Sequence, residues 1–547
     1  MILTAVLALG LLQTPAPQPE APSARISGRV VAADTGKPIR WATVRTVSAR
    51  GRQLVTATDP QGRFEFTALP AGTYRLDAAA ERYVRMYLGG QPYTGLSAVI
   101  PRGVTVTDGE SFQKADFALP RGSAIEGRLL DEFGDPAPGL VVQVSQLLYA
   151  GGRRRLMPVG NANLAQPTDD RGHFRIHGLS PGTYYVSAVS GAFAAQAETG
   201  GFAPTYYPGT ADVTTAQPVR LALGQQLELT FPLVPARMAR LSGRVVDAAG
   251  EPVSRATLTI STSDRLGISD FNITRGATEP DGTFVFRNVP PGSFTLQAFG
   301  AQVSTAGNLG ASEFGWLPIV VDGSDQQGLT IRVAPGPSLK GRVTVDDLSP
   351  PFDAKAAGVR VTALPVQFDS APVGGGPPPY TLNDDGTFEV KNMSGRRIIR
   401  VSVQSPDWML SRITRQSRDI TDEPVDFGRG EIGDIEVVLT NRVTSITGTV
   451  ADAEANPLSE YGVVIFTTDP AKWTDRSRFV ALGRPSQDGS FIVGGLPPDE
   501  YFAVALPATQ GSEWQDPDVL KMLQEGATRF FLGEGEQKAL TLRIRQP

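Results

Sequence analysis

The sequence lacks cysteine altogether in its 547 residues, so it can form neither a disulfide bond nor a zinc site with thiolate ligands. Histidine is nearly absent as well, with two residues. The 51 basic and 56 acidic side chains leave a net charge of −5, and no basic tail or stripe offers the cluster that binds a phosphate backbone. The composition predicts a protein held together by packing alone and argues against a nucleic-acid partner.

Beyond the N-terminus the sequence has no long apolar run, and no stretch there approaches the ~20 apolar residues of a membrane-spanning helix. The run from Ile2 to Leu12 has the length of a signal-peptide core, and a spacer rich in proline, alanine and serine follows it as far as Ser23. We interpret residues 1–22 as a signal peptide and spacer. The alternative is a disordered or wrongly assigned start, because no lysine or arginine precedes the apolar run. The mature chain is expected to be exported to the periplasm, the cell surface or the medium, with no integral membrane segment.

Glycine and proline are plentiful, with 59 and 44 residues, which favours turns over long helices. A first-strand pattern with a central glycine returns five times, at intervals of 98 to 116 residues. The interval matches an immunoglobulin-like sandwich of about 100 residues and exceeds the ~20 to 50 residues of solenoid repeats. We expect an all-β protein of five tandem immunoglobulin-like (prealbumin-like) β-sandwich domains in an elongated array. The five glycines are Gly28, Gly127, Gly243, Gly341 and Gly448.

The expected domain boundaries follow this repeat, and the last two domains diverge from the first three. Linkers between domains are short and contain proline, as in the segment from Ala334 to Ser338, which predicts a semi-rigid rod. After residues 1–22, the domains are expected at residues 23–121, 122–237, 238–336, 337–442 and 443–547.

A second motif in each repeat predicts two short strands joined by turns. In the clearest copy, Asp281-Gly282 supplies the positive φ that a tight turn requires, and Phe284 and Phe286 alternate as in a half-buried strand. Pro290-Pro291-Gly292 then turns the chain into the next strand. The acidic residues invite comparison with calcium loops, but no copy supplies the ligand series of an EF-hand. Since β-turns favour Asp and Asn anyway, we expect structural turns, with calcium as the alternative.

The Gly-Arg-Val strand, the Thr-Asp-x-x-Gly-x-Phe turn and the Leu-Pro-Pro-Gly-x-Tyr turn together resemble the carboxypeptidase regulatory-like domain, a transthyretin-like β-sandwich. The resemblance covers essentially the whole chain after residue 22 and is clearest in the first three domains. It implies a secreted or surface-exposed accessory module, grouped by fold with carbohydrate-binding-like sandwiches. Relatives fused to zinc carboxypeptidases or outer-membrane transport barrels carry their activity in those other domains. The roughly forty residues after Leu506 are expected to be too few for such a domain.

Two pairs of residues are candidate reactive sites. His173 and His177 lie four residues apart on an expected strand, about 13 Å from each other, too far to bind one ion directly. We expect both at the surface. Lys340 and Asn441 lie in the first and last strands of the fourth domain, where related sandwiches form an isopeptide cross-link. Lys340 is out of phase with the buried face, so we expect no such bond.

Aromatic residues before the last strand of each domain form the candidate binding surface, because aromatic faces stack on sugar rings and anchor protein partners. The alternative is that they close the open end of each sandwich. The pair Tyr206-Tyr207 is the best candidate, since loop prolines and glycines would hold it rigidly. The candidates are Tyr206, Tyr207, Phe314, Trp316, Trp408 and Trp514.

No catalytic residue, metal site or cofactor is expected. No arrangement of histidine or cysteine residues and no nucleophile-elbow motif in the sequence supports catalysis. The alternative is an enzyme that uses a pair of carboxylates for catalysis. We expect a non-catalytic exported multidomain binding or scaffold protein of the cell envelope, with polysaccharide or another envelope protein as its partner. The main alternative is a structural or protein-interaction accessory module of an envelope peptidase or outer-membrane transport system.

Overall fold

The protein is almost entirely β, which confirms the expected fold class. In the described ranges α1 (Pro517–Leu523) is the only α-helix, and no helix there is long and apolar enough to cross a membrane. The predicted signal peptide, residues 1–22, lies outside these ranges. The computed structural model describes residues 24–48, 53–92, 103–150, 152–159, 167–190, 201–262, 274–300, 313–346, 352–366, 380–458, 461–486, 488–507 and 514–545.

The strands form successive groups of sheets, which we call units 1 to 5 in chain order. Unit 1 contains β1 (Ala24–Ala32), β2 (Thr43–Ser48), β3 (Gln53–Ala57), β4 (Arg63–Leu69), β5 (Gly72–Ala79), β6 (Met86–Tyr87), β7 (Gln91–Pro92), β8 (Gly103–Val106), β9 (Ser111–Phe112) and β10 (Phe117–Leu119). Unit 2 contains β11 (Ser123–Leu130), β12 (Leu140–Ala150), β13 (Arg153–Pro158), β14 (His173–Leu179), β15 (Gly182–Ser190), β16 (Gly201–Phe202), β17 (Thr205–Tyr206), β18 (Val219–Leu221), β19 (Gln226–Pro232) and β20 (Pro235–Ala236).

The remaining units are built in the same way. Unit 3 contains β21 (Ala239–Val246), β22 (Thr257–Thr262), β23 (Thr274–Ala277), β24 (Thr283–Val289), β25 (Gly292–Phe299), β26 (Phe314–Val321) and β27 (Gln326–Arg332). Unit 4 contains β28 (Leu339–Val345), β29 (Arg360–Pro365), β30 (Tyr380–Leu382), β31 (Thr387–Val390), β32 (Arg396–Ser402), β33 (Met409–Arg415), β34 (Arg418–Asp419), β35 (Pro424–Asp426) and β36 (Ile432–Thr440). Unit 5 contains β37 (Ser445–Ala451), β38 (Tyr461–Thr467), β39 (Val480–Gly483), β40 (Ser490–Gly494), β41 (Asp499–Pro507), α1, β42 (Thr528–Leu532) and β43 (Gln537–Arg543).

Each unit encloses its own cluster of buried apolar side chains between its sheets. Unit 5 has a second cluster, in which Leu520 and Leu523 of α1 pack with Val464 and Phe466 of β38. Separate cores fit the expected sandwiches, but a core of its own does not show that a unit folds alone. The five domain boundaries therefore remain predictions.

One topology recurs. The first strand of a unit lies in the middle of its sheet, between an antiparallel neighbour and a late strand that runs parallel to it. In unit 3, for example, β21 pairs antiparallel with β24 and parallel with β27. In units 3 and 5 a second, four-stranded sheet completes a sandwich of the expected kind.

The parallel pairing explains the glycine at the centre of each first strand. A Cβ added at any of these glycines would overlap the carbonyl oxygen of the facing residue on the late segment of the unit. Only glycine permits this close approach. The facing residues are Ala115, Leu229, Leu329, Ile435 and Leu540 in units 1 to 5.

The threonine of the Thr-Asp-x-x-Gly-x-Phe motif fastens the turn to the bend after the first strand. In unit 3 the Thr278 hydroxyl donates to the Val253 carbonyl at 2.7 Å and accepts from the Ala256 amide at 2.8 Å. Thr58 and Thr168 make the same two contacts in units 1 and 2. The motif glycine has the expected positive φ in every unit, 76° at Gly282. Units 4 and 5 have no threonine at the first position, which is one reason why their sequences look divergent.

The tyrosine of the Pro-x-Gly-x-Tyr turn also has one repeated role. Tyr74, Tyr184 and Tyr501 each donate a hydrogen bond of 2.7 Å to the carbonyl four residues earlier in the chain. Unit 3 has Phe294 at this place, and unit 4 has Arg397, whose Nε donates to the Ser394 carbonyl at 2.8 Å. The turn that drifted in sequence in unit 4 therefore keeps a side-chain hydrogen bond to its own backbone, but from a different side chain and to the carbonyl three residues earlier.

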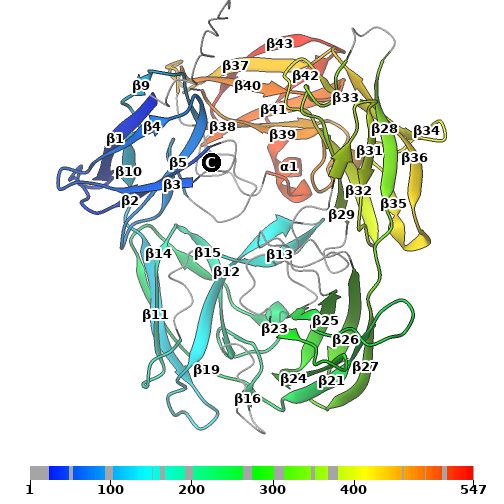
Figure 1. Ribbon diagram of the computed structural model, residues 1–547. Coiled ribbons are helices and arrows are strands. Elements are labelled where there is room, and N and C mark those ends of the chain that lie inside the picture. Colours follow the sequence, from blue (N-terminus) through cyan, green and yellow to red (C-terminus); the bar gives the residue numbers. More distant parts are fainter. Residues whose placement is uncertain are drawn as a thin grey trace, which may run out of the picture.

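The expected elongated array is wrong at one point, because the chain turns back on itself and unit 2 contacts unit 5. Figure 1 shows β13 reaching toward α1 in the middle of the molecule. Arg154 on β13 lies 2.7 Å from Asp516, the residue that caps α1. The repeat and the linkers report only on consecutive units, so they carry no signal for a contact across 362 residues.

Candidate functional site

The acidic side chains of the repeated turns hydrogen-bond to the turns themselves. Asp281 accepts from the Thr283 amide at 3.0 Å and from its hydroxyl at 2.6 Å, and these bonds keep the Asp281 pKa below its ordinary value. Asp385 makes the equivalent pair of bonds with Thr387. Among the described residues no group of three or more histidine, cysteine or acidic side chains is placed to hold a metal ion. The turn acids act on local backbone geometry.

The two histidines lie on β14 of unit 2. His173 is exposed and its amide donates to Asp169 at 2.8 Å, while His177 is partly buried and pairs with Ala124 of β11. Lys340 of unit 4 points outward, with its Nζ 3.1 Å from Glu431 and 3.8 Å from Glu389. Lys340 thus forms ion pairs with acidic side chains on the outer surface.

Of the six aromatic candidates, Trp316 is the one that remains exposed, with 42% of its surface accessible. It lies on β26, opposite Gln297 of β25, at the edge of a sheet in unit 3. Pro318 and Val320 follow it on the same outward face, and Val320 is 70% exposed. These three side chains form an apolar strip along the edge strand.

The other five candidates pack against the cores. Tyr206 and Trp514 are buried. Tyr207 meets Phe231 edge to face at 5.8 Å between ring centroids, Phe314 lies 5.5 Å from Phe299, and Trp408 lies 4.6 Å from Phe352. Their packing matches the alternative that these aromatics close the ends of the sandwiches. A binding role for any of the six is a prediction that this packing does not test.

Two exposed aromatics lie outside the loops that the sequence singled out. Trp41 is 69% exposed and Phe133 is 83% exposed. Trp41 has a left-handed backbone, φ 60°, in the bend where unit 2 has Gly139 at φ 76°. A large residue in that region is strained. Aligning the bends between repeats places Trp41 with Gly139, Gly358 and Arg255, all of which have a positive φ.

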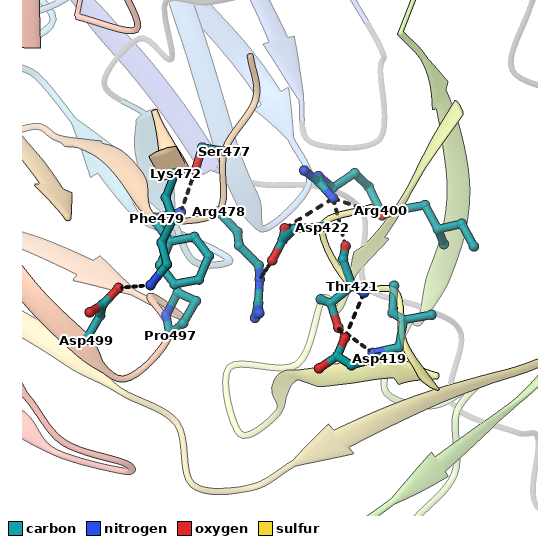
Figure 2. Close-up of polar contacts among 12 residues, drawn as sticks. Arg400, Asp419, Thr421, Asp422, Lys472, Ser477, Arg478, Phe479, Pro497 and Asp499 are labelled. Atoms are coloured by element: carbon teal, nitrogen blue, oxygen red, sulfur yellow. Dashed lines mark hydrogen bonds and ion pairs between the residues drawn. The ribbon is translucent and has the colours of Figure 1, made fainter. Parts of the chain in front are cut away.

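Among the described residues, an extensive polar contact joins units 4 and 5. Figure 2 shows Arg400 and Arg478 on either side of Asp422. Arg478 of unit 5 donates from Nε to the Asp422 carboxylate at 2.9 Å, and Arg400 Nη1 lies 3.6 Å from its other oxygen. Arg400 Nη2 also donates to the Arg476 carbonyl at 3.4 Å. One carboxylate thus holds two guanidinium groups across the junction.

The loop that carries Asp422 is fixed by its own hydrogen bonds. The Thr421 hydroxyl donates to Asp419 and accepts from the Ile413 amide at 2.8 Å, and the Thr421 carbonyl accepts from Arg400 at 3.2 Å. Arg400 is 17% exposed, and burial lowers its pKa while Asp422 opposes the change. Ile399, Thr421 and Asp422 of unit 4 supply most of the acceptors of this buried guanidinium, and the Arg476 carbonyl supplies one from unit 5.

On the unit 5 side, cations stack on an aromatic ring beside the junction. Lys472 Nζ lies 4.6 Å and the Arg478 guanidinium 4.9 Å from the centre of the Phe479 ring. Lys472 also pairs with Asp499 at 2.7 Å. A second link lies nearby, where Arg442 contacts Asp346 of unit 4 and Glu534 of unit 5, both at 2.9 Å.

The contact between units 2 and 5 is smaller. Arg154 donates from Nε to Asp516 at 2.7 Å and its Nη2 lies 3.1 Å from Asp518. Tyr149, which pairs with Arg154 in the β12–β13 hairpin, has its pKa raised by burial and by the nearby Asp475 and Asp516. Charged side chains of unit 5 therefore surround the end of this hairpin.

Comparison with known families finds one match: the carboxypeptidase regulatory-like domain model matches residues 25–120 and 240–316, in units 1 and 3. These are two of the units that keep the threonine fastening of the turn. No curated protein matches the chain.

Solved structures that resemble the chain include two pilins and a carbohydrate-binding candidate. A streptococcal ancillary pilin is 13% identical with a TM-score of 0.20, over 57% of this chain and 98% of the pilin. The minor pilin GBS52 of Streptococcus agalactiae is 15% identical with a TM-score of 0.21, over 39% of this chain and 95% of the pilin. A putative carbohydrate binding protein from Pseudomonas aeruginosa is 10% identical with a TM-score of 0.14, over 18% of this chain and 89% of that protein.

Proposed function

The chain carries carboxypeptidase regulatory-like domains at two places, and on that premise we propose that it is a non-catalytic scaffold of the cell envelope. In this proposal the chain is exported and holds β-sandwich units at fixed positions, where they present their outer surfaces to another envelope protein. The accessory role that the family resemblance implies supports the proposal.

The observation that carries it is the use of charged side chains between units. Arg400, Asp422 and Arg478 join units 4 and 5 through contacts from three chain segments. A flexible string of binding modules would need no such network, whereas a scaffold needs defined distances between its units. When a partner touches two fixed units, the second contact benefits from a high effective concentration.

The experiment is cross-linking of the full chain to its partners in an envelope extract, with the contact residues mapped by mass spectrometry. A scaffold should cross-link to a defined partner through at least two units. Asp422→Asn should loosen the junction between units 4 and 5 and weaken that partner's binding about tenfold or more. Glu423→Gln is the matched control, since Glu423 pairs with Arg418 within unit 4. Cross-links confined to one unit, or equal affinity of both variants, would contradict the proposal.

A second candidate function is polysaccharide binding, which the exposed Trp316 favours. An indole face on an edge strand, with an apolar strip beside it, can stack on a sugar ring. We expect Trp316→Ala to abolish binding on a glycan array and to leave thermal stability nearly unchanged. Phe531→Ala, at a residue that is 62% exposed in unit 5, is the control and should retain binding. A silent array with the full chain would reject this candidate.

A further inference from the structure

Arg154 joins unit 2 to unit 5 through Asp516 and Asp518. It lies on a hairpin, in which β12 and β13 pair from Ser145 and Pro158 to Ala150 and Arg153. This pairing belongs to unit 2 alone, so the hairpin does not need unit 5 for its backbone hydrogen bonds. Losing the Arg154 contact would leave the hairpin ladder intact.

Asp516 has a role within unit 5 that does not depend on unit 2. Its Oδ1 accepts from the Asp518 amide at 2.9 Å and caps α1, while its Oδ2 accepts from Arg154. An acidic side chain at this position stabilises a helix N-terminus without any further partner. When the contact with Arg154 is broken, Oδ1 still caps the helix, and only Oδ2 needs a water molecule to replace its hydrogen bond.

The exposure of the three side chains sets how ions reach the contact. Arg154 is 49% exposed and Asp518 is 75% exposed, whereas Asp516 is 8% exposed. Counterions therefore reach Arg154 and Asp518 directly, and at about 1 M salt the screening length falls to about 3 Å. The junction of units 4 and 5 differs, because several separate contacts cross it: Arg478 pairs with Asp422, Arg400 donates to the Arg476 carbonyl, and Arg442 pairs with Glu534.

We propose that the contact of Arg154 with Asp516 and Asp518 is an ionic latch between a closed and an open form of the protein. In the closed form the β12–β13 hairpin lies against the N-terminus of α1. In the open form unit 2 has separated from unit 5, and units 4 and 5 stay together as one body. The latch concerns the shape of the chain and does not depend on which partner the scaffold binds.

The absence of cysteine makes the latch measurable by energy transfer in the full chain. Dyes attached at Phe133→Cys in unit 2 and Met522→Cys in α1 would report separation, since both positions are exposed, by 83% and 62%. Raising the salt from about 0.1 M to about 1 M should reduce the transfer reversibly and increase the radius of gyration in X-ray scattering.

Two variants test the latch without unfolding either side. Arg154→Gln removes the cation, and Asp516→Asn removes the charge but keeps a residue that caps helices well. Both should show low transfer already at low salt, with unchanged hydrogen-exchange protection at Leu520 in α1. Glu126→Gln, which removes an ion pair with Arg175 inside unit 2, should behave as the unaltered chain. High transfer in either latch variant, or transfer in the unaltered chain that does not change with salt, would overturn the proposal.

Discussion

Gly341 of β28 lies so close to Ile435 of β36 that no side chain fits between the two parallel strands. A Cβ at Gly341 would overlap the Ile435 carbonyl oxygen and would lie 2.8 Å from both the Ile435 Cβ and the Phe388 ring. Backbone cannot move aside here without breaking the ladder that joins the first and last strands of unit 4. The same relationship recurs at the central glycine of every unit.

Gly341→Ala should therefore destabilise unit 4 by about 3 kcal/mol, as overpacking of a tight site does. Gly433→Ala on β36 is the matched control, because nothing lies within 4 Å of a Cβ at that position. The measurement is hydrogen exchange of peptides from β28 and β36 in the full chain. Equal protection in the two variants would show that the close approach is not a constraint.

Tyr184→Phe should destabilise unit 2 by about 1 to 2 kcal/mol, because the Ser180 carbonyl loses its buried donor. Tyr184 is 1% exposed, so water cannot readily replace the hydroxyl. Tyr185→Phe, one residue along the same strand and partly exposed, should cost little. Urea unfolding monitored by exchange in β15 would separate the two. Identical midpoints would mean that the tyrosine hydroxyl does not stabilise the turn.

Alkaline pH should weaken unit 2 through the same residue. Burial raises the pKa of Tyr184 from 10.0 to about 12. The folded state favours the neutral phenol, so its contribution is complete below pH 10 and is lost as the pH rises toward 12. The difference corresponds to about 2 to 3 kcal/mol. Comparing unfolding midpoints at pH 9 and pH 11 should show a drop in unit 2 that is smaller in Tyr184→Phe.

Thr278→Val should cost unit 3 about 2 kcal/mol or more, because it leaves the Ala256 amide without an acceptor in a buried bend. The replacement keeps the shape of the side chain, so the loss isolates the two hydrogen bonds of the hydroxyl. Thr330→Val on β27 replaces an exposed threonine of the same unit and is the control. Thermal melting with exchange readout in β22 should rank the two variants. A Thr278→Val variant as stable as the control would refute the fastening role.

The sequence predicted the elements that depend on local chemistry. The turn glycines, the alternating strands and the all-β class follow from residues within one motif, as Gly282 and Phe284 illustrate. The role of Tyr184 was harder to foresee, because the pattern shows a buried aromatic and not the acceptor of its hydroxyl. The sequence does not predict that Arg397 replaces this tyrosine in unit 4, because a charged residue at a core position usually indicates that the apolar pattern of a strand has ended.

The contacts between units leave no signal in the repeat pattern. Arg154 lies in the run Gly151-Gly152-Arg153-Arg154-Arg155, a composition typical of a flexible surface loop, and its partner Asp516 lies 362 residues away. Trp41 lies in the bend after the first strand, outside the segment before the last strand where the candidate aromatics are expected. The Arg154 contact depends on where side chains of distant segments meet in space, which a repeat pattern in a single chain does not record.

The parallel pairing of first and last strands has a mechanical consequence. Because β21 and β27 run in the same direction, the chain enters unit 3 at one end of this pair and leaves it at the other. Tension along the protein would therefore pull the two strands past each other and strain their hydrogen bonds together, instead of opening them one after another. Such a unit should unfold abruptly at high force. The central glycine allows the parallel pairing, so it also contributes to the unfolding force.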